Sequence, residues 1–340
     1  MNKAYISQMV WIFYLIIGSI TISYSQDIHY SQFYNSPLNL NPANTGLFKG
    51  DQRFMLSYRD QWRFVPVPWL TFSAAYDQKI FPKNSDKYFF GVGGNFNYDK
   101  QGSSNLNLAS LNLSGSYTRI LSAHHIVTAG LLVGLNSRAF NPDNLTWDKQ
   151  WDGVAYDPNL PSQENFDLKR LFFIETGAGI NYRLQQDTRT KLDIGIGAYH
   201  LVEPKTNFYD IENQKLPRHY TLSAVGTIKV AGPIDIQLHG LRQIQGEYGE
   251  TVFGGLAKIY LSQARGKETE LHIGLGYRTA GSYIPTLALE YKNWYVGINY
   301  DIDKTEFNQI LSNKGGPEVH VRYIIQKVRP MNTRKNCPIY

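Results

Sequence analysis

The chain of 340 residues carries a formal net charge of +6 and a single cysteine, Cys337. One cysteine excludes an internal disulfide framework and a metal site built from several cysteines, and the absence of any run of five basic residues argues against a nucleic-acid partner. The mean hydropathy is −0.35, and beyond the first 25 residues no stretch supplies the roughly 18 apolar residues of a membrane helix.

Residues 1–25 are predicted to form a secretory signal peptide. Lys3 is the only early charge, residues 10–20 form a short apolar run, and Ser23 and Ser25 occupy the small-residue positions of a cleavage site. No cysteine follows the run, so we expect no lipid anchor at this end. The mature chain is expected to leave the cytoplasm and to begin at Gln26.

Residues 26–52 form the next predicted unit, a segment without strand periodicity. It contains the stretch QDIHYSQFYNSPLNLNPANTG, in which Pro37 and Pro42 favour extended or turned backbone and Gly46 closes the run. A non-strand segment of this length is expected to fold against or into the interior of the structure that follows.

Residues 53–326 are dominated by alternation of apolar and polar side chains, which is the pattern of strands with two differently solvated faces. In LHIGLGYR, for example, Ile273 and Leu275 alternate with His272 and glycines. The 24 Tyr and 29 Gly residues also suit strands and tight turns. The predicted strands are 53–62, 70–80, 88–99, 106–121, 124–140, 166–185, 190–204, 218–230, 233–246, 249–262, 269–281, 283–293, 294–303 and 316–326.

The connections between these strands are sorted by length. The three longest, 141–165, 205–217 and 304–315, all follow odd-numbered strands, whereas the connections after even-numbered strands are short. Short turns on one rim and long loops on the other are typical of outer-membrane barrels, and a soluble propeller or sandwich gives no reason for such sorting. We therefore predict an all-β, transmembrane antiparallel β-barrel of about fourteen strands, with residues 26–52 packed at or in its lumen.

The faces and ends of this barrel follow from the same pattern. The apolar face should meet outer-membrane lipid and the polar face a lumen. Tyrosines near strand ends should form an interfacial girdle; these are Tyr277, Tyr291, Tyr300 and Tyr323. The tail, 327–340, is expected on the periplasmic side, where its basic residues either contact acidic partners or form an ordinary solvated terminus.

The longest loop combines aromatic and acidic side chains. Trp147, Trp151 and Tyr156 lie beside several prolines, as in anchors for a protein partner, although packing onto the barrel mouth is the equal alternative. The acidic residues could hold calcium, but their spacing does not match an EF-hand, so a solvated loop is preferred; these are Asp143, Asp148, Asp152, Asp157, Glu164 and Asp167.

Motifs for catalysis, cofactors and metals are absent from the sequence. There is no G-x-S-x-G, H-E-x-x-H or C-x-x-C pattern. Four histidines fall on the expected inner face, namely His200, His239, His272 and His320. Since the sequence indicates no serine–carboxylate partnership for them, we interpret them as lumen lining and predict a protein without enzymatic activity, cofactor or metal.

The combination SQFYNSPLNLNPANTG and YRDQW resembles the amino-terminal signature of the PorP/SprF family of Bacteroidota outer-membrane proteins. The resemblance extends over the whole mature chain. The matching motif positions, which we expect to be structural, are Asn41, Pro42, Gly46, Arg59, Gln61 and Trp62. The positions between Asn-Pro-Ala and the glycine depart from the family pattern, because Asn44 and Thr45 stand where an aromatic or Leu is usual.

This resemblance implies an outer-membrane component of the type IX secretion and gliding-motility apparatus. Members of the family have no known catalysis; they support export or surface anchoring of a secreted adhesin through its carboxyl-terminal signal domain, or link to periplasmic secretion machinery. Two alternatives come from the residues alone. One is a diffusion channel or a transporter of hydrophobic compounds, with the amino-terminal segment as plug or gate, and the other is an outer-membrane enzyme.

Overall fold

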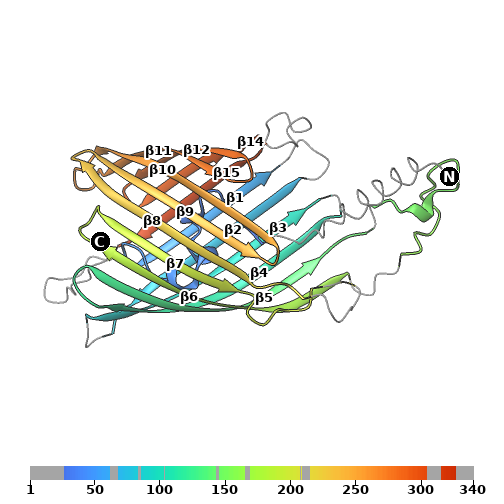
Figure 1. The fold of residues 1–340 in the computed structure, drawn as a ribbon, viewed down its shortest axis with the longest axis horizontal. Helices are drawn as coiled ribbons and strands as arrows, with labels where there is room; N and C mark the ends of the chain where they lie inside the picture. Colours follow the sequence, from blue (N-terminus) through green and yellow to red (C-terminus); the bar gives the residue numbers. More distant parts are fainter. Residues whose placement is uncertain are drawn as a thin grey trace, which may run out of the picture.

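The computed structural model describes residues 27–61, 68–82, 86–102, 104–142, 145–164, 169–206, 208, 215–304 and 315–326. The predicted signal peptide, the tail 327–340 and Trp62 lie outside these ranges. Within them the chain forms one antiparallel sheet that closes on itself (Figure 1). Closure leaves no free sheet edge, so every strand has hydrogen-bonded neighbours on both sides, as a hydrocarbon environment requires.

Fourteen strand positions make up the ring, because β13 and β14 are one strand interrupted at Asp301. β1 pairs with β15 and β11 pairs with β12, which closes the barrel. The strands are β1 Gln52–Gln61, β2 Trp69–Ile80, β3 Tyr88–Gln101, β4 Leu106–Ile120, β5 His125–Ala139, β6 Arg170–Gln185, β7 Lys191–Tyr199, β8 His219–Ala231, β9 Ile234–Gln245, β10 Tyr248–Ser262, β11 Thr269–Arg278, β12 Ser282–Tyr291, β13 Trp294–Tyr300, β14 Ile302–Asp303 and β15 Pro317–Ile325.

The predicted barrel fold is confirmed, with differences at strand ends. β7 stops at Tyr199, five residues before its predicted end, because His200 and Glu203 adopt positive φ angles of 55° and 46° that break the ladder. β11 likewise ends at Arg278 and a turn begins. The start of the predicted strand 166–185 falls partly outside the described residues, and β6 is seen from Arg170.

The barrel is inverted relative to a soluble protein. Apolar side chains on alternate positions point outward and are uncovered by protein, as with Leu131 at 69% exposure, whereas Ser, Thr, Asn, Asp and Arg side chains are buried inside. Ile273 and Leu275 face out while His272 and Arg278 face in, as the alternation predicts.

Exposed aromatics lie near strand ends at both rims, as interfacial girdles would. Those at the short-turn rim are Phe54, Phe90, Tyr117, Tyr291 and Trp294, and those at the long-loop rim are Phe172, Tyr220, Tyr283 and Tyr300. Of the four predicted girdle tyrosines, Tyr291 and Tyr300 are exposed, and Tyr277 and Tyr323 are half-buried.

The two rims of the barrel differ as predicted. The long-loop rim carries the connections 140–169, 200–218 and 304–316, and the short-turn rim carries connections such as 232–233 and 292–293. Since outer-membrane barrels keep short turns on the periplasmic side, the long-loop rim faces outward. Among the described residues, no helix is long and apolar enough to cross a membrane.

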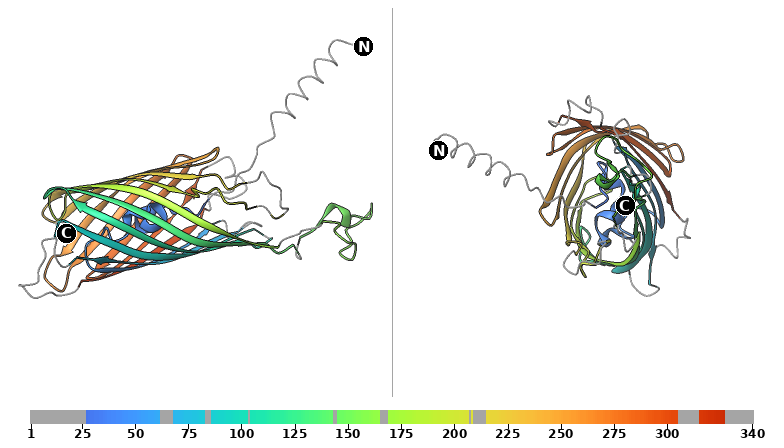
Figure 2. Two further views of the ribbon diagram at one scale, coloured as in Figure 1. Left: turned by 90° about the horizontal axis from the view of Figure 1, so that it is seen from below. Right: turned by 90° about the vertical axis from the view of Figure 1, so that its right-hand side faces the viewer.

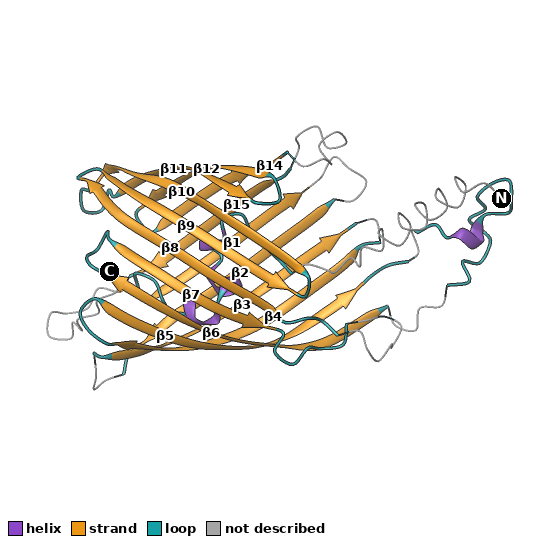
Figure 3. Ribbon diagram, in the orientation of Figure 1, coloured by secondary structure: helices purple, strands orange, loops and turns teal. Residues whose placement is uncertain are grey.

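Residues 27–51, here called the plug, lie inside the ring of strands (Figure 2, right). The plug contains three short helices, η1 Phe33–Asn35, α2 Pro37–Leu40 and η2 Pro42–Asn44, seen within the barrel in Figure 3. It runs from Asp27 near the long-loop rim to Asp51, whose backbone N–H bonds Ile325 at the short-turn rim.

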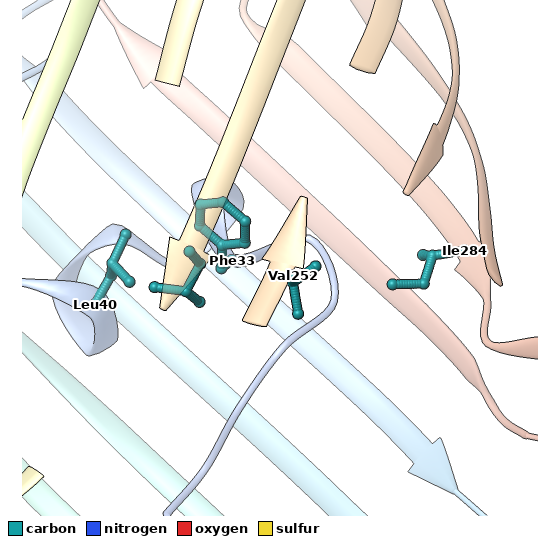
Figure 4. Close-up of a cluster of buried hydrophobic side chains, with 5 residues drawn as sticks. Phe33, Leu40, Val252 and Ile284 are labelled. Atoms are coloured by element: carbon teal, nitrogen blue, oxygen red, sulfur yellow. The ribbon is translucent and has the colours of Figure 1, made fainter. Parts of the chain in front are cut away.

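A small apolar core joins the plug to the wall (Figure 4). Phe33 and Leu40 of the plug pack with side chains from β9, β10 and β12, namely Leu241, Val252 and Ile284. A second apolar cluster joins Leu47 of the plug to Phe89 of β3 and Ile126 of β5. The polar contacts between plug and wall are described next.

Candidate functional site

Arg59 of β1 is the main polar anchor of the plug. Its side chain is 1% exposed; Nη1 donates to the carbonyl oxygen of His29 at 2.7 Å and Nη2 to Oδ2 of Asp301 at 2.7 Å. Its Nε lies 3.7 Å from Oε2 of Glu318. The inward turn of Asp301 at the break between β13 and β14 therefore gives the guanidinium a carboxylate partner in the lumen.

The same carboxylates hold the plug backbone directly. Glu318 accepts hydrogen bonds from the backbone N–H groups of Ser31 and Gln32 at 2.9 and 2.7 Å, and Asp301 accepts one from the Ser31 hydroxyl at 2.7 Å. Arg278 donates to the same hydroxyl at 2.7 Å and also contacts Glu250. Charge-assisted hydrogen bonds of this kind are roughly twice as strong as neutral ones, so this end of the plug is firmly tied.

The Asn41–Gly46 motif packs against a part of the barrel wall where the facing residues are glycines. The Asn41 side chain accepts from the Ala43 N–H at 2.9 Å and donates to the Ile180 carbonyl at 3.0 Å. A Cβ at Gly130 would lie 2.4 Å from the carbonyl carbon of Pro42, and one at Gly91 2.2 Å from the Thr45 carbonyl oxygen. These glycines are therefore needed because the plug backbone rests on the strand backbone.

Gly46 of the plug and Arg53 of β1 both bind the carboxylate of Asp77. Gly46, with φ of +73°, donates its N–H to Oδ2 of Asp77 at 2.7 Å, and Arg53 binds both oxygens of Asp77 at 2.9 and 2.7 Å. Of the other motif positions, Gln61 ends β1 opposite Trp69 and no side-chain hydrogen bond is seen for it among the described residues. Trp62 lies outside the described ranges.

The plug begins in an acidic and histidine-rich cluster at the long-loop rim. Oδ2 of Asp27 lies 2.5 Å from Nε2 of His200 and 3.1 Å from Nδ1 of His219, while Nδ1 of His200 lies 2.6 Å from Oε2 of Glu175. Burial of the His200 ring disfavours its charge, but the two carboxylates outweigh burial and raise the pKa of His200 to about 10. Burial would likewise raise the pKa of Asp27, but His200 and His219 hold it well below 3.8. The plug therefore starts with an ion pair.

One constellation that the sequence did not indicate is Ser57, His320 and Glu318. Ser57 Oγ lies 2.7 Å from Nδ1 of His320, and Nε2 of His320 lies 2.7 Å from Oε1 of Glu318. The expectation that no inner-face histidine has a serine–carboxylate partnership is therefore wrong. The cause is strand pairing, because Ser57 and His320 are register partners of β1 and β15.

This arrangement has the residue types of a catalytic triad but not its surroundings. Ser57 is buried and does not line any of the described cavities. Tyr30 packs edge-on to the His320 ring at 5.4 Å. Since Glu318 also accepts the two plug N–H groups, the three residues belong to the bonding between plug and wall.

A cavity of about 510 Å³ lies between the plug and the short-turn rim, where it opens. Charged side chains line it, and most are paired: Arg183 binds Asp193 at 2.7 and 3.0 Å, and Arg322 binds Glu290 at 2.8 Å. Glu270, His272 and Glu290 bring possible metal-ligand atoms within 4.8 Å of one another. Arg322 already forms an ion pair with Glu290, and Lys258 is the register partner of His272 on the neighbouring strand. This wall is therefore neutralised by cations from the protein.

The predicted partner-contact residues lie on the longest loop, which projects beyond the long-loop rim (Figure 2, left). Trp151 and Tyr156 form an isolated antiparallel bridge, and their side chains are 57% and 44% exposed. Trp147 is half-buried, and its backbone N–H donates to Oε1 of Gln150 at 3.0 Å. The segment 145–164 does not line the lumen cavities.

The loop carboxylates act locally. Asp152 accepts the N–H groups of Ala155 and Val154, both at 2.7 Å, and these bonds lower the pKa of the Asp152 carboxyl. Asp157 accepts the N–H of Asn159 at 2.9 Å. Both therefore cap turns, which is the ordinary role of Asp in a solvated loop. Asp143 and Asp167 lie outside the described residues.

Comparison with known proteins identifies the family. The family model for the type IX secretion system membrane protein PorP/SprF matches residues 22–323, nearly the whole chain. The chain belongs to the PorP/SprF family. With its closed antiparallel sheet, it is an outer-membrane β-barrel of the type IX secretion system, as the motif resemblance implied. None of the curated proteins compared with the chain matches it.

One solved structure reaches a TM-score of 0.50 with this PorP/SprF barrel and two others fall just below that value, all at low sequence identity. The TodX deltaS2S3 mutant monoaromatic hydrocarbon channel is 9% identical, with 85% of this chain and 92% of that chain covered and a TM-score of 0.50. The toluene transporter TodX of P. putida is 10% identical, with coverages of 86% and 95% and a TM-score of 0.48. A FadL homologue of Pseudomonas aeruginosa is 10% identical, with coverages of 83% and 92% and a TM-score of 0.49.

Proposed function

We propose that this PorP/SprF barrel is a closed, non-enzymatic docking component that works by binding at its two rims. In this proposal the outer loops hold a secreted adhesin, through its carboxyl-terminal signal domain, and the short-turn rim meets periplasmic components of the secretion machinery. The observation that carries the proposal is the plug, which is tied to the wall through Arg59, Glu318 and Asp301. Because the plug lies across the lumen, we assign partner binding to the two rims.

The longest loop supports a protein contact on the outer side. Trp151, Val154 and Tyr156 are 57%, 86% and 44% exposed, and they sit together at a turn closed by the Asp152 cap. Large aromatic side chains held in a fixed turn lose little entropy on binding, which is why they are frequent anchors in interfaces.

The test is the double variant Trp151→Ser, Tyr156→Ser, with surface display of the adhesin and its co-purification with the barrel as readouts. Two lost anchors should weaken co-purification by about tenfold or more. Leu113→Ser is the matched control, because Leu113 is 63% exposed but lies in the middle of β4, away from both rims. Normal display and co-purification in the double variant would remove the outer loop from the proposal.

The channel alternative has its own measurement. The solved structures that share this fold include proteins described as a hydrocarbon channel and a toluene transporter, but at 9–10% identity the likeness concerns the fold alone. In planar bilayers the plugged barrel should give no large, steady current. Stable conductance of the intact protein would favour a diffusion channel over a docking component.

A further inference from the structure

Three neighbouring strands present a row of hydrogen-bond donors to the cavity at the short-turn rim. Lys191 of β7 is the register partner of Thr227 of β8, and Thr227 is the register partner of Gln237 of β9. Inward-facing partners on adjacent strands lie side by side, and all three residues line the cavity of about 510 Å³. They are called the donor row below.

The donor row is not used by the protein itself. Thr227 and Gln237 are 4% and 6% exposed, yet Oγ1 of Thr227 and Nε2 of Gln237 have no hydrogen-bond partner among the described residues. Among the described residues the side-chain ammonium of Lys191 makes no hydrogen bond or ion pair. Buried polar groups are almost always satisfied, so these two groups and the ammonium must bond either water or a ligand that enters the cavity.

The carboxylates near the donor row are already engaged. Asp193 is held by both Arg183 bonds. Asp235 accepts from Arg189 at 2.9 Å and from the Tyr260 hydroxyl at 2.6 Å. Each of these carboxylates therefore already has an arginine partner, and the cavity lining as a whole carries more basic than acidic side chains.

We propose that Lys191, Thr227 and Gln237 form a binding site for a small oxyanion, a phosphate or a carboxylate group, that enters from the short-turn rim. An ammonium, a hydroxyl and an amide N–H are all donors, which suits the acceptor oxygens of such a group. Arg189, Lys292 and Gln326 line the same cavity and place its mouth at this rim. The site is independent of the outer-loop docking function.

The experiment titrates the purified mature barrel, in a neutral detergent and a buffer without phosphate or carboxylate, with inorganic phosphate and separately with acetate. Calorimetry should give a dissociation constant of about 1 mM or tighter for at least one of them. Lys191→Met should weaken that binding by about tenfold or more, because it removes a charge-assisted bond. Saturation by only one of the two anions identifies the group as phosphate or carboxylate.

Two further variants separate a site from general charge. Thr227→Val removes a hydroxyl that has no internal partner, so it should weaken anion binding while leaving the unfolding midpoint without anion unchanged. Lys229→Met removes the same charge as Lys191→Met, but from an exposed residue of β8, the strand that carries Thr227. It should leave anion binding unchanged. The proposal is overturned if neither anion binds saturably, or if Lys229→Met weakens binding as much as Lys191→Met. Should Lys191→Met fail to fold, unchanged binding in Thr227→Val overturns it as well.

Discussion

Replacing Arg59 with methionine should destabilise the barrel more than any exposed charge change. The substitution removes two 2.7 Å hydrogen bonds, to the Asp301 carboxylate and the His29 carbonyl, and the 3.7 Å ion pair with Glu318. Hydrogen bonds that involve a charged group contribute about 1.5–3 kcal/mol each. Asp301 keeps its bonds to Ser31 and Arg278, so the terms do not simply add, and we expect a loss of about 3–5 kcal/mol, as for other broken buried pairs.

The assay is equilibrium unfolding in urea with the barrel in lipid vesicles, followed by tryptophan fluorescence. Arg218→Met is the matched control, because the Arg218–Glu203 pair spans 3.4 Å with side chains 47% and 39% exposed, and such pairs are worth about 0–1 kcal/mol. The reasoning is refuted if Arg59→Met costs no more than Arg218→Met. The plug would then not depend on its buried ion pairs.

Three other changes probe the plug, its ion pair and the lipid face. Gly130→Ala should cost about 1–3 kcal/mol because its Cβ would collide with the plug backbone at 2.4 Å, whereas Gly115→Ala, with nothing within 4 Å, should cost far less; equal unfolding midpoints would contradict this. Since the pKa of His200 is raised from 6.5 to about 10, its contribution to stability is complete below pH 6.5 and is lost as the pH rises toward 10. The Asp27 contribution is present above pH 3.8 and is lost as the pH falls through its lowered pKa. Protease cleavage of the plug should therefore increase at acid pH, below the pKa of Asp27, and again as the pH rises toward 10. His200→Gln should abolish the increase at alkaline pH. Leu131→Arg should reduce stability in vesicles by about 2–4 kcal/mol, and an unchanged value would place Leu131 outside the lipid face.

The residues that alternate along each strand were enough to predict the barrel. Side-chain period, strand length and the sorting of loops are local properties, and each is set by the two solvents that meet a membrane barrel. The non-strand character of residues 26–52 also follows from local chemistry, since Pro37 and Pro42 do not suit a strand. The early ends of β7 at Tyr199 and of β11 at Arg278 were not predicted, because the alternation continues into residues where the backbone turns.

What the sequence could not determine is which residues meet across the lumen. Ser57 and His320 are 263 positions apart, and Arg59 and Asp301 are 242 apart. Lys191, Thr227 and Gln237 form a row only because β7, β8 and β9 pair in one register. A shift by one residue would turn each of these side chains to the other face of the sheet. Composition and periodicity therefore determined the barrel and its orientation to lipid, whereas strand register and the path of the plug decided the sites inside it.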